Sequence, residues 1–380
     1  MISFQPTEDE ISFIKVAKDF AKNRIRPLAR ACEKRRAVDK TLDDEAAELG
    51  FLSLELPESW EGLELSSITQ VQLMQALSYG DLDIIQGFQG AGDAASLFRL
   101  LPDIPILKNN KEDLAGGATT ALLDLGNGVE GPGKQLNIHR RQDGYILQGL
   151  SHPVRMAPSA DYAMIAGDDS HGKSVILWLD NSADWTIQQG DYRLGLLASG
   201  LGRLSFERVK VPATHVLAEG EAADDILREA RTRIRILQAA KETGLMEAAL
   251  DYATEYTAER KAFGREIAAF QGVSFRVASM ALETRIANHL VLEAAAGMDN
   301  QEPAAERLSL RAMHRAHRSL RYVTDSAVQL LGGHGFVQDF PAEKWMRDAQ
   351  AQVMLYGREN DLLARSGDHL IAGEKEVTVT

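Results

Sequence analysis

The sequence contains very little cysteine and no long apolar run. Cys32 is the single cysteine among 380 residues, which excludes an internal disulfide framework and fits a reducing compartment. No stretch approaches the roughly 18 consecutive apolar residues that a membrane-spanning helix requires. The segment from Met1 to Pro6 lacks the basic region and apolar run of a secretion signal. We therefore expect a cytoplasmic protein without a membrane span.

An excess of basic residues is also missing. The chain carries 42 Lys and Arg against 55 Asp and Glu, a formal net charge of -13, so we expect no nucleic-acid partner. One basic row has members that share helical faces: Arg311, His314, Arg315, His317, Arg318 and Arg321. We expect this row to be a solvated face or an inter-subunit ion-pair strip. His314 and His317 are three residues apart without an evident third ligand, so we expect no metal site.

The chain has the composition of a soluble globular protein, with 44% hydrophobic and 26% charged residues. Thr7-Glu8-Asp9-Glu10 is a capping box, which predicts the start of an amphipathic helix. Further helices are predicted within 42–49, where Gly50 is placed to end the helix, and within 63–79. The segment 101–110, with two prolines and two asparagines, is predicted to be a loop.

The middle of the chain is rich in short β-prone runs bounded by turn residues. These runs, at 144–147, 161–165, 174–179 and 204–211, predict an antiparallel sheet or barrel. From about Ala222 the chain is helical again, with predicted breaks at 260–271, 300–303 and 331–341. The order is therefore helical, then β, then helical.

Two C-terminal stretches resemble one known family. The first runs from Tyr256 to Gly264 and is followed by Phe270-Gln271. The second is Ala327-Val328-Gln329-Leu330-Leu331-Gly332-Gly333-His334-Gly335-Phe336, followed by Pro341 and Met346-Arg347-Asp348-Ala349. In this order and at this separation they resemble the C-terminal domain of the acyl-CoA dehydrogenases. Segments 49–51, 57–63 and 206–212 extend the resemblance over nearly the whole chain.

The resemblance implies an α+β, mainly α fold with three domains. We expect an N-terminal helical domain over 1–115, a middle β-barrel domain over 116–221 and a C-terminal four-helix bundle over 222–380. The family's activity is FAD-dependent α,β-dehydrogenation of acyl-CoA, with electrons passed to an electron-transfer flavoprotein. Members are oligomers, commonly tetramers, in which one subunit reaches over the FAD of its neighbour.

By the same resemblance, six residues should contact the adenine half of FAD. Arg260 stands at the position that contacts the pyrophosphate, with Phe263 and Gln271 flanking the adenosine end. Gln329, Gly332 and Gly333 stand where the family lines the same arm. A guanidinium suits a phosphate, and adjacent glycines allow backbone N–H groups to approach an anion.

The flavin-ring contacts of the family are replaced. Where relatives have a Thr-Glu-Pro…Gly-Ser-Asp motif, Leu123 stands at the threonine and Val129 at the serine. The family's Trp-Ile-Thr-Asn segment, which packs on the ring, reads Pro153-Val154-Arg155-Met156. A buried polar atom that loses its partner is destabilised by about 1–3 kcal/mol. We therefore expect this chain's own isoalloxazine pocket to be lost.

The family's catalytic carboxylate is also absent. Gly357 occupies its usual position, and Ile234, ahead of Arg235, occupies the alternative position on an earlier helix. Glu359 lies two residues further on, roughly 200° around a helix from Gly357, so a solvated or cap-proximal acid is its expected role. We expect no catalytic residue in this chain and assign none to Arg235.

The leading hypothesis is a non-catalytic, FAD-completing subunit of a heteromeric acyl-CoA dehydrogenase. Some relatives form α2β2 heterotetramers, notably in steroid side-chain degradation, and the expected pathway here is lipid or steroid catabolism. A homo-oligomeric flavoenzyme of altered chemistry, such as a monooxygenase or oxidase, is one alternative. A pseudoenzyme that binds acyl-CoA or a protein is another, and a DNA-associated relative is a third. New tasks for Arg155 or Glu359 stay open.

Overall fold

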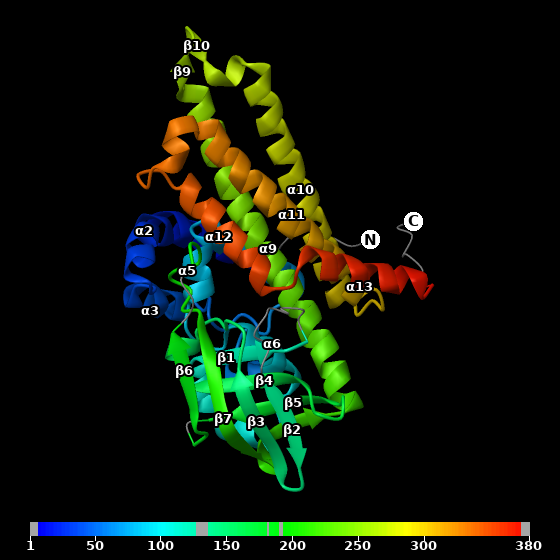
Figure 1. The fold of residues 1–380 in the computed structure, drawn as a ribbon. Helices are drawn as coiled ribbons and strands as arrows, with labels where there is room; N and C mark the ends of the chain where they lie inside the picture. The colour runs from blue at the N-terminus through cyan, green and yellow to red at the C-terminus, as the bar shows by residue number, and fades with distance from the viewer. Residues whose placement is uncertain (1–6, 127–135, 181, 190–192, 374–380) are drawn as a thin grey trace.

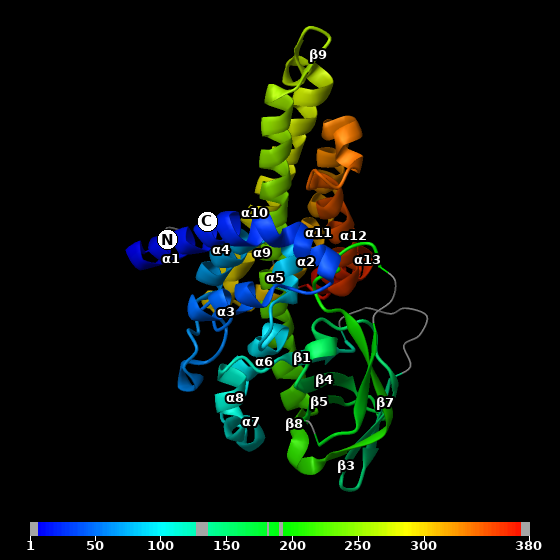
Figure 2. The same cartoon turned by 90° about the vertical axis from the view of Figure 1, so that its left-hand side faces the viewer.

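A computed structural model describes residues 7–126, 136–180, 182–189 and 193–373. The fold is mostly helical, with a β domain between two helical regions (Figures 1 and 2). The α+β, mainly α class expected from the sequence is therefore confirmed. Over the described parts of the chain, no helix is both long enough and apolar enough to cross a membrane.

The N-terminal region is a set of short helices. Thr7 caps the first one as predicted, because its side chain accepts from the Glu10 N–H while the Glu10 carboxylate accepts from the Thr7 N–H. The elements are α1 Glu8–Phe20, η1 Ala21–Ile25, α2 Arg26–Arg35, α3 Lys40–Glu48, η2 Glu58–Trp60, α4 Ser67–Ser78, α5 Leu82–Gly87, η3 Gly92–Ala94, α6 Ala95–Leu100, α7 Pro105–Asn109 and α8 Lys111–Ala115. Gly50 follows α3 with a φ of 79°, as a helix-ending glycine should.

The predicted loop at 101–110 is wrong for its second half. Helix α7 begins at Pro105, and the fixed φ of proline suits the first position of a helix, where no N–H is needed. The prolines and asparagines of this segment suggested a loop, although Pro105 begins a one-turn helix.

The β domain consists of two four-stranded sheets. One has the order β1-β4-β5-β8 and the other the order β2-β3-β7-β6. The strands are β1 Thr120–Asp124, β2 Asn137–Arg141, β3 Gly144–Leu150, β4 Tyr162–Asp168, β5 Ser174–Leu179, β6 Trp185–Gln189, β7 Gly202–Pro212 and β8 Val216–Glu219, with η4 Ala157–Ser159 and η5 Ala213–His215 between them. A fully antiparallel arrangement was wrong, because β1 pairs with β4 in parallel.

Long helices form the C-terminal region and extend away from the β domain (Figure 1). Helix α9 runs from beside the β domain to the far end of the molecule, where a small hairpin joins it to α10. The elements are α9 Glu221–Glu259, β9 Lys261–Ala262, β10 Arg265–Glu266, η6 Ile267–Ala269, α10 Gln271–Asp299, α11 Ala305–Leu331, η7 Gly332–Phe336, α12 Ala342–Leu355 and α13 Glu359–Ile371. The three predicted breaks all fall between these helices.

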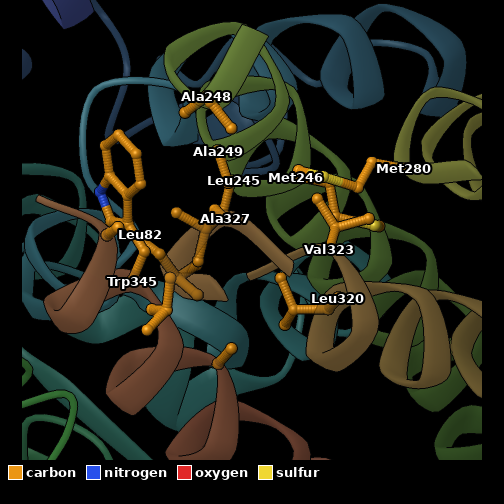
Figure 3. Close-up of a cluster of buried hydrophobic side chains, with 14 of the residues drawn as sticks. Leu82, Leu245, Met246, Ala248, Ala249, Met280, Leu320, Val323, Ala327 and Trp345 are labelled. Atoms are coloured by element: carbon orange, nitrogen blue, oxygen red, sulfur yellow. The ribbon is translucent and has the colours of Figure 1, made fainter. Parts of the chain in front are cut away.

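A shared core joins α5 to the C-terminal helices. Figure 3 shows Leu82 and Trp345 facing small and aliphatic side chains of α9 and α11, with Met280 of α10 beside Met246. Alanines on α9 let its neighbours approach closely, which is how an alanine-rich helix of ordinary hydrophobicity becomes central to the bundle.

Candidate functional site

Neither of the two positions where the sequence resemblance places a catalytic base carries a carboxylate. Gly357 is buried in the connection between α12 and α13 and has a φ of 103°, which favours glycine. Ile234 is a buried residue of α9 and lines two adjoining cavities. Proton abstraction from a substrate therefore has no obvious residue at either position.

Glu359 is the nearest acid in sequence to Gly357, and its carboxylate is engaged elsewhere. It stands at the first position of α13 and forms an ion pair with Arg321 of α11. This contact fits the structural role expected for Glu359.

Arg155, which the sequence resemblance places at the position of a small hydroxyl, contacts two residues of the N-terminal region. Its Nη1 donates a 2.7 Å hydrogen bond to the Gln86 carbonyl oxygen, and its Nε lies 3.9 Å from Asp93 Oδ2. A Cβ at Gly92 would clash with Arg155 Nη2, so the guanidinium depends on the glycine beneath it. Met156 follows in the left-handed region, with a φ of 57°.

A small cavity lies beside Arg155. This cavity is lined by residues of β1, the 152–155 segment, Ile234 and Tyr356, and it measures about 50 Å³. Cofactor pockets are typically about 300–1,000 Å³. The described side chains leave room there for a few water molecules.

The residues on β1 lie differently from the sequence expectation. Leu123 packs in the interior of the β domain, while Leu122 and Asp124 line the small cavity. Asp124 accepts hydrogen bonds of 2.7 and 2.8 Å from Arg231, whose guanidinium lies over Gly126. Val129 lies outside the described residues.

A buried polar network that the sequence did not reveal is centred on Asp93. Asp93 Oδ1 accepts from Gln238 Nε2 and Oδ2 accepts from the Tyr356 hydroxyl, both at 2.8 Å. Burial acts to raise the pKa of Asp93, but the nearby cations Arg155 and Lys241 hold it below its ordinary value. Asp93 is therefore a fixed anion bound by its neighbours.

Lys241 belongs to the same network. Its Nζ donates a 3.3 Å hydrogen bond to Gln86 Oε1, and Gln86 in turn donates to Gln238 Oε1 at 2.6 Å. Burial, followed by repulsion from Arg155, lowers the pKa of Lys241 to about 7. One sequence signal was available: Gln238, Lys241 and Glu242 fall three and four apart in an alanine-rich helix, so they share one face.

The six residues predicted for the adenine half of FAD are all solvent-exposed. They occupy two segments at the end of the bundle far from the β domain, namely the α9–α10 hairpin and the end of α11 (Figures 1 and 2). The exposed residues are Arg260, Phe263, Gln271, Gln329, Gly332 and Gly333. Phe263 is 95% exposed, which is unusual for a phenylalanine within one chain and is typical of a contact surface.

Tyr256 connects these two segments. Its hydroxyl lies 2.9 Å from His334 Nδ1 and donates to the Leu331 carbonyl at 3.3 Å, so the end of α9 is fixed against η7. A Cβ at Gly332 or Gly333 would meet nothing within 4 Å, which leaves their backbone open to an incoming group. These residues therefore fit an extended anionic ligand such as the diphosphate arm of FAD.

The basic row on α11 is largely paired within the chain. Arg315 Nη2 lies 2.6 Å from a Glu283 oxygen, and Arg311 Nη2 lies 3.5 Å from Glu293. His317 is fully buried, with Nδ1 3.0 Å from Glu242. The basic side chains of Arg311, Arg315 and His317 are therefore held in contacts with acids of the same chain.

Arg235 is buried behind the site. Its Nη1 lies 3.5 Å from the Ser309 hydroxyl and 3.9 Å from Glu306, and burial lowers its pKa to about 9. These contacts belong to the bundle interior.

One group of potential metal ligands lies within the described part of the chain. Asp81, Asp83 and Asp348 have oxygens within 4.8 Å of one another. The Lys344 ammonium lies among them, 2.7 Å from Asp81 and from Asp348 and 3.6 Å from Asp83. This ammonium already supplies the positive charge, and the cluster connects α5 to α12.

Known proteins share this architecture along most of the chain. The acyl-CoA dehydrogenase N-terminal domain model matches residues 7–97, and the C-terminal domain model matches residues 203–370. An acyl-CoA dehydrogenase of Bacillus subtilis (strain 168) is 26% identical over 372 residues, covering 94% of this chain and 96% of the relative.

Solved structures agree with these matches. The butyryl-CoA dehydrogenase from Megasphaera elsdenii superimposes with a TM-score of 0.83 at 26% identity, covering 97% of this chain and 100% of that one. A chain of a structure described as an electron transferring flavoprotein of Acidaminococcus fermentans has a TM-score of 0.85 at 25% identity, with the same coverage. The chain belongs to the acyl-CoA dehydrogenase family.

Proposed function

We propose that this chain is a non-catalytic, FAD-completing subunit of a heteromeric acyl-CoA α,β-dehydrogenase. One contrast carries the proposal. The residues suited to the adenine half of FAD are exposed at the end of the bundle, whereas Arg155, in the segment where the resemblance expects ring contacts, is engaged with Gln86 and Asp93. A chain that serves only a neighbour's FAD needs the first set and not the second.

The residues of this chain would bind and position rather than react. Arg260 would neutralise the pyrophosphate of the partner's FAD, Phe263 and Gln271 would contact its adenosine end, and the open backbone at Gly332 and Gly333 would border the same arm. Hydride acceptance is the chemistry that FAD supplies in this family. The partner chain would contribute the ring pocket and the carboxylate that removes the substrate proton.

The assembly proposed is a cytoplasmic α2β2 tetramer that acts on an acyl-CoA of lipid or steroid catabolism. An electron-transfer flavoprotein would accept its electrons. The likeness to a chain from the Acidaminococcus fermentans electron transferring flavoprotein structure supports this acceptor. The exposed phenylalanines 263, 275 and 336 support a subunit interface on the bundle.

The flavin content of purified protein tests the proposal. The chain is expressed alone and together with an acyl-CoA dehydrogenase-like chain encoded beside it, and the FAD-to-protein ratio is measured from absorbance. We expect a colourless lone chain and a yellow, active complex. A lone chain with one FAD per protomer contradicts the proposal and favours a homo-oligomeric flavoenzyme of altered chemistry. A colourless complex that binds acyl-CoA favours the pseudoenzyme.

Two arginine variants test whether Arg260 of this chain contacts the FAD of the complex. Arg260→Ala should lower the FAD content of the complex, because a phosphate contact at the interface is lost. Arg141→Ala should leave it unchanged, since Arg141 is exposed on the β2–β3 hairpin at the opposite end of the molecule (Figure 1). Equal FAD content in both variants would show that Arg260 does not reach the cofactor.

A further inference from the structure

A small cavity lies between the N-terminal helices, the segment after β3, and α9. It measures about 70 Å³, enough for a few water molecules or a group of roughly four to six heavy atoms. Much of its wall is apolar and includes Phe51, Leu54, Leu77 and Phe88. Lys241 also lines it, so an ammonium group faces a largely apolar space.

The positive charge at this cavity exceeds the negative charge available to balance it. Arg155 and Lys241 both line the wall, with Asp93 as the carboxylate between them. Asp93 already accepts hydrogen bonds from Gln238 and Tyr356. A single carboxylate thus serves two buried cations.

The other acids nearby are engaged with their own partners. Glu55 lines the same cavity, but its oxygens lie 3.0 Å from Arg99 and 3.7 Å from Arg233. Glu242, next to Lys241 on α9, faces His317 at 3.0 Å. Neither acid offsets the charge of Lys241.

Lys241 has unused hydrogen-bonding capacity. An ammonium has three N–H donors, and within the described part of the chain Lys241 makes one hydrogen bond, of 3.3 Å, to Gln86 Oε1. The residue is only 6% exposed, so bulk water does not serve the remaining donors freely. A buried cation in this situation is stabilised by an anion that completes its contacts.

We propose that this cavity binds a small organic carboxylate, with the anionic group held between Lys241 and Arg155 and a short apolar tail against the phenylalanine and leucine wall. The carboxylate comes either from a free short-chain acid or from the far end of a short dicarboxylic acyl-CoA. Without a base at Gly357 or Ile234, the chain holds this ligand and does not convert it. The site stands independently of the proposed FAD-completing role.

Calorimetry on the full chain tests the proposal with a matched ligand pair. Butyrate and butyramide have similar shapes and differ in charge, so butyramide should bind at least about tenfold more weakly. Titration near pH 8 in HEPES and in Tris, which differ in ionisation enthalpy, reports proton uptake. Because the pKa of Lys241 is about 7, a bound carboxylate should draw in up to about one proton per site.

Two variants and a second ligand pair complete the test. Lys241→Met should abolish both the butyrate preference and the proton uptake, whereas Lys108→Met, at an exposed lysine, should change neither. Succinyl-CoA binding more tightly than butyryl-CoA identifies an acyl-CoA source, and binding of free butyrate alone identifies a free acid.

Butyrate binding no better than butyramide in the wild-type chain would overturn the proposal, whatever the variants do. Unchanged butyrate affinity in a folded Lys241→Met protein would overturn it as well. If that variant fails to fold, the wild-type preference for butyrate over butyramide still decides the result.

Discussion

Tyr356 donates a 2.8 Å hydrogen bond to Asp93, which joins the end of α12 to η3 across 263 residues of sequence. Tyr356 immediately precedes Gly357, the residue where the sequence resemblance places a catalytic base. No carboxylate stands at that position, and the neighbouring phenol instead fixes a partly buried carboxylate of the N-terminal region.

Removal of this phenol should destabilise the chain. We expect Tyr356→Phe to lower the free energy of unfolding by about 1–3 kcal/mol, because Asp93 stays largely shielded from water and loses a donor. Urea unfolding of the lone chain measures the change. Tyr322→Phe, at a partly exposed tyrosine of α11, is the matched control and should shift the free energy by less than about 0.5 kcal/mol. Equal effects of the two changes would show that the Asp93 contact contributes nothing specific.

Restoring a carboxylate at Gly357 should not restore the reaction. Gly357→Glu places a side chain at a φ of 103°, a conformation whose strain is about 1–3 kcal/mol for a residue other than glycine. Under the proposed function, Arg155 would still stand in place of a ring contact. We expect no acyl-CoA-dependent dye reduction by this variant with added FAD, as for the wild-type lone chain. Turnover above that background would mean that the ring site is intact.

The Lys344 cluster should be a strong determinant of stability. Lys344→Met leaves three buried carboxylates without their cation, and we expect a loss of about 3–5 kcal/mol in the free energy of unfolding. Asp83→Asn is the milder comparison, because the amide oxygen still accepts from the Ala198 N–H, which lies 3.0 Å from Asp83 Oδ2. Urea unfolding compares the two. A larger loss from Asp83→Asn would contradict the central role of Lys344.

Local sequence signals predicted the helical boundaries well, and long-range contacts explain what they missed. The Thr7 capping box and the Gly50 helix end depend on a few neighbouring residues, so they are visible in the sequence. The parallel pairing of β1 with β4 depends on chain topology, which alternation of side chains does not specify.

The candidate site also contains residues that the sequence could predict and residues that it could not. The six residues at the end of the bundle carry the family's motifs and could be named from the sequence, although their role stays a prediction. The Asp93 network could not be named, since Gln238 and Tyr356 reach Asp93 across 145 and 263 residues. Each of these side chains alone looks like an ordinary polar residue.

The stability of the chain should depend on pH through Lys241. Its pKa is about 7 in the folded chain and about 10.5 when unfolded, so burial disfavours its charged form. Below about pH 7 both states are protonated and the folded state carries the full penalty; above about pH 10.5 both are neutral and the penalty vanishes. Lys241→Met should therefore stabilise the chain by roughly 2–4 kcal/mol near pH 6, and this gain should shrink as the pH rises.

Urea unfolding of both proteins at several pH values between about 6 and 10 measures this gain, since titrating groups that do not interact with Lys241 are common to both and cancel in the difference. Lys108→Met serves as the control, because its side chain is 61% exposed and its charge is solvated in both states. A pH-independent difference between wild type and Lys241→Met would mean that Lys241 keeps an ordinary pKa. Its ammonium would then be fully charged at neutral pH, and carboxylate binding would proceed without proton uptake.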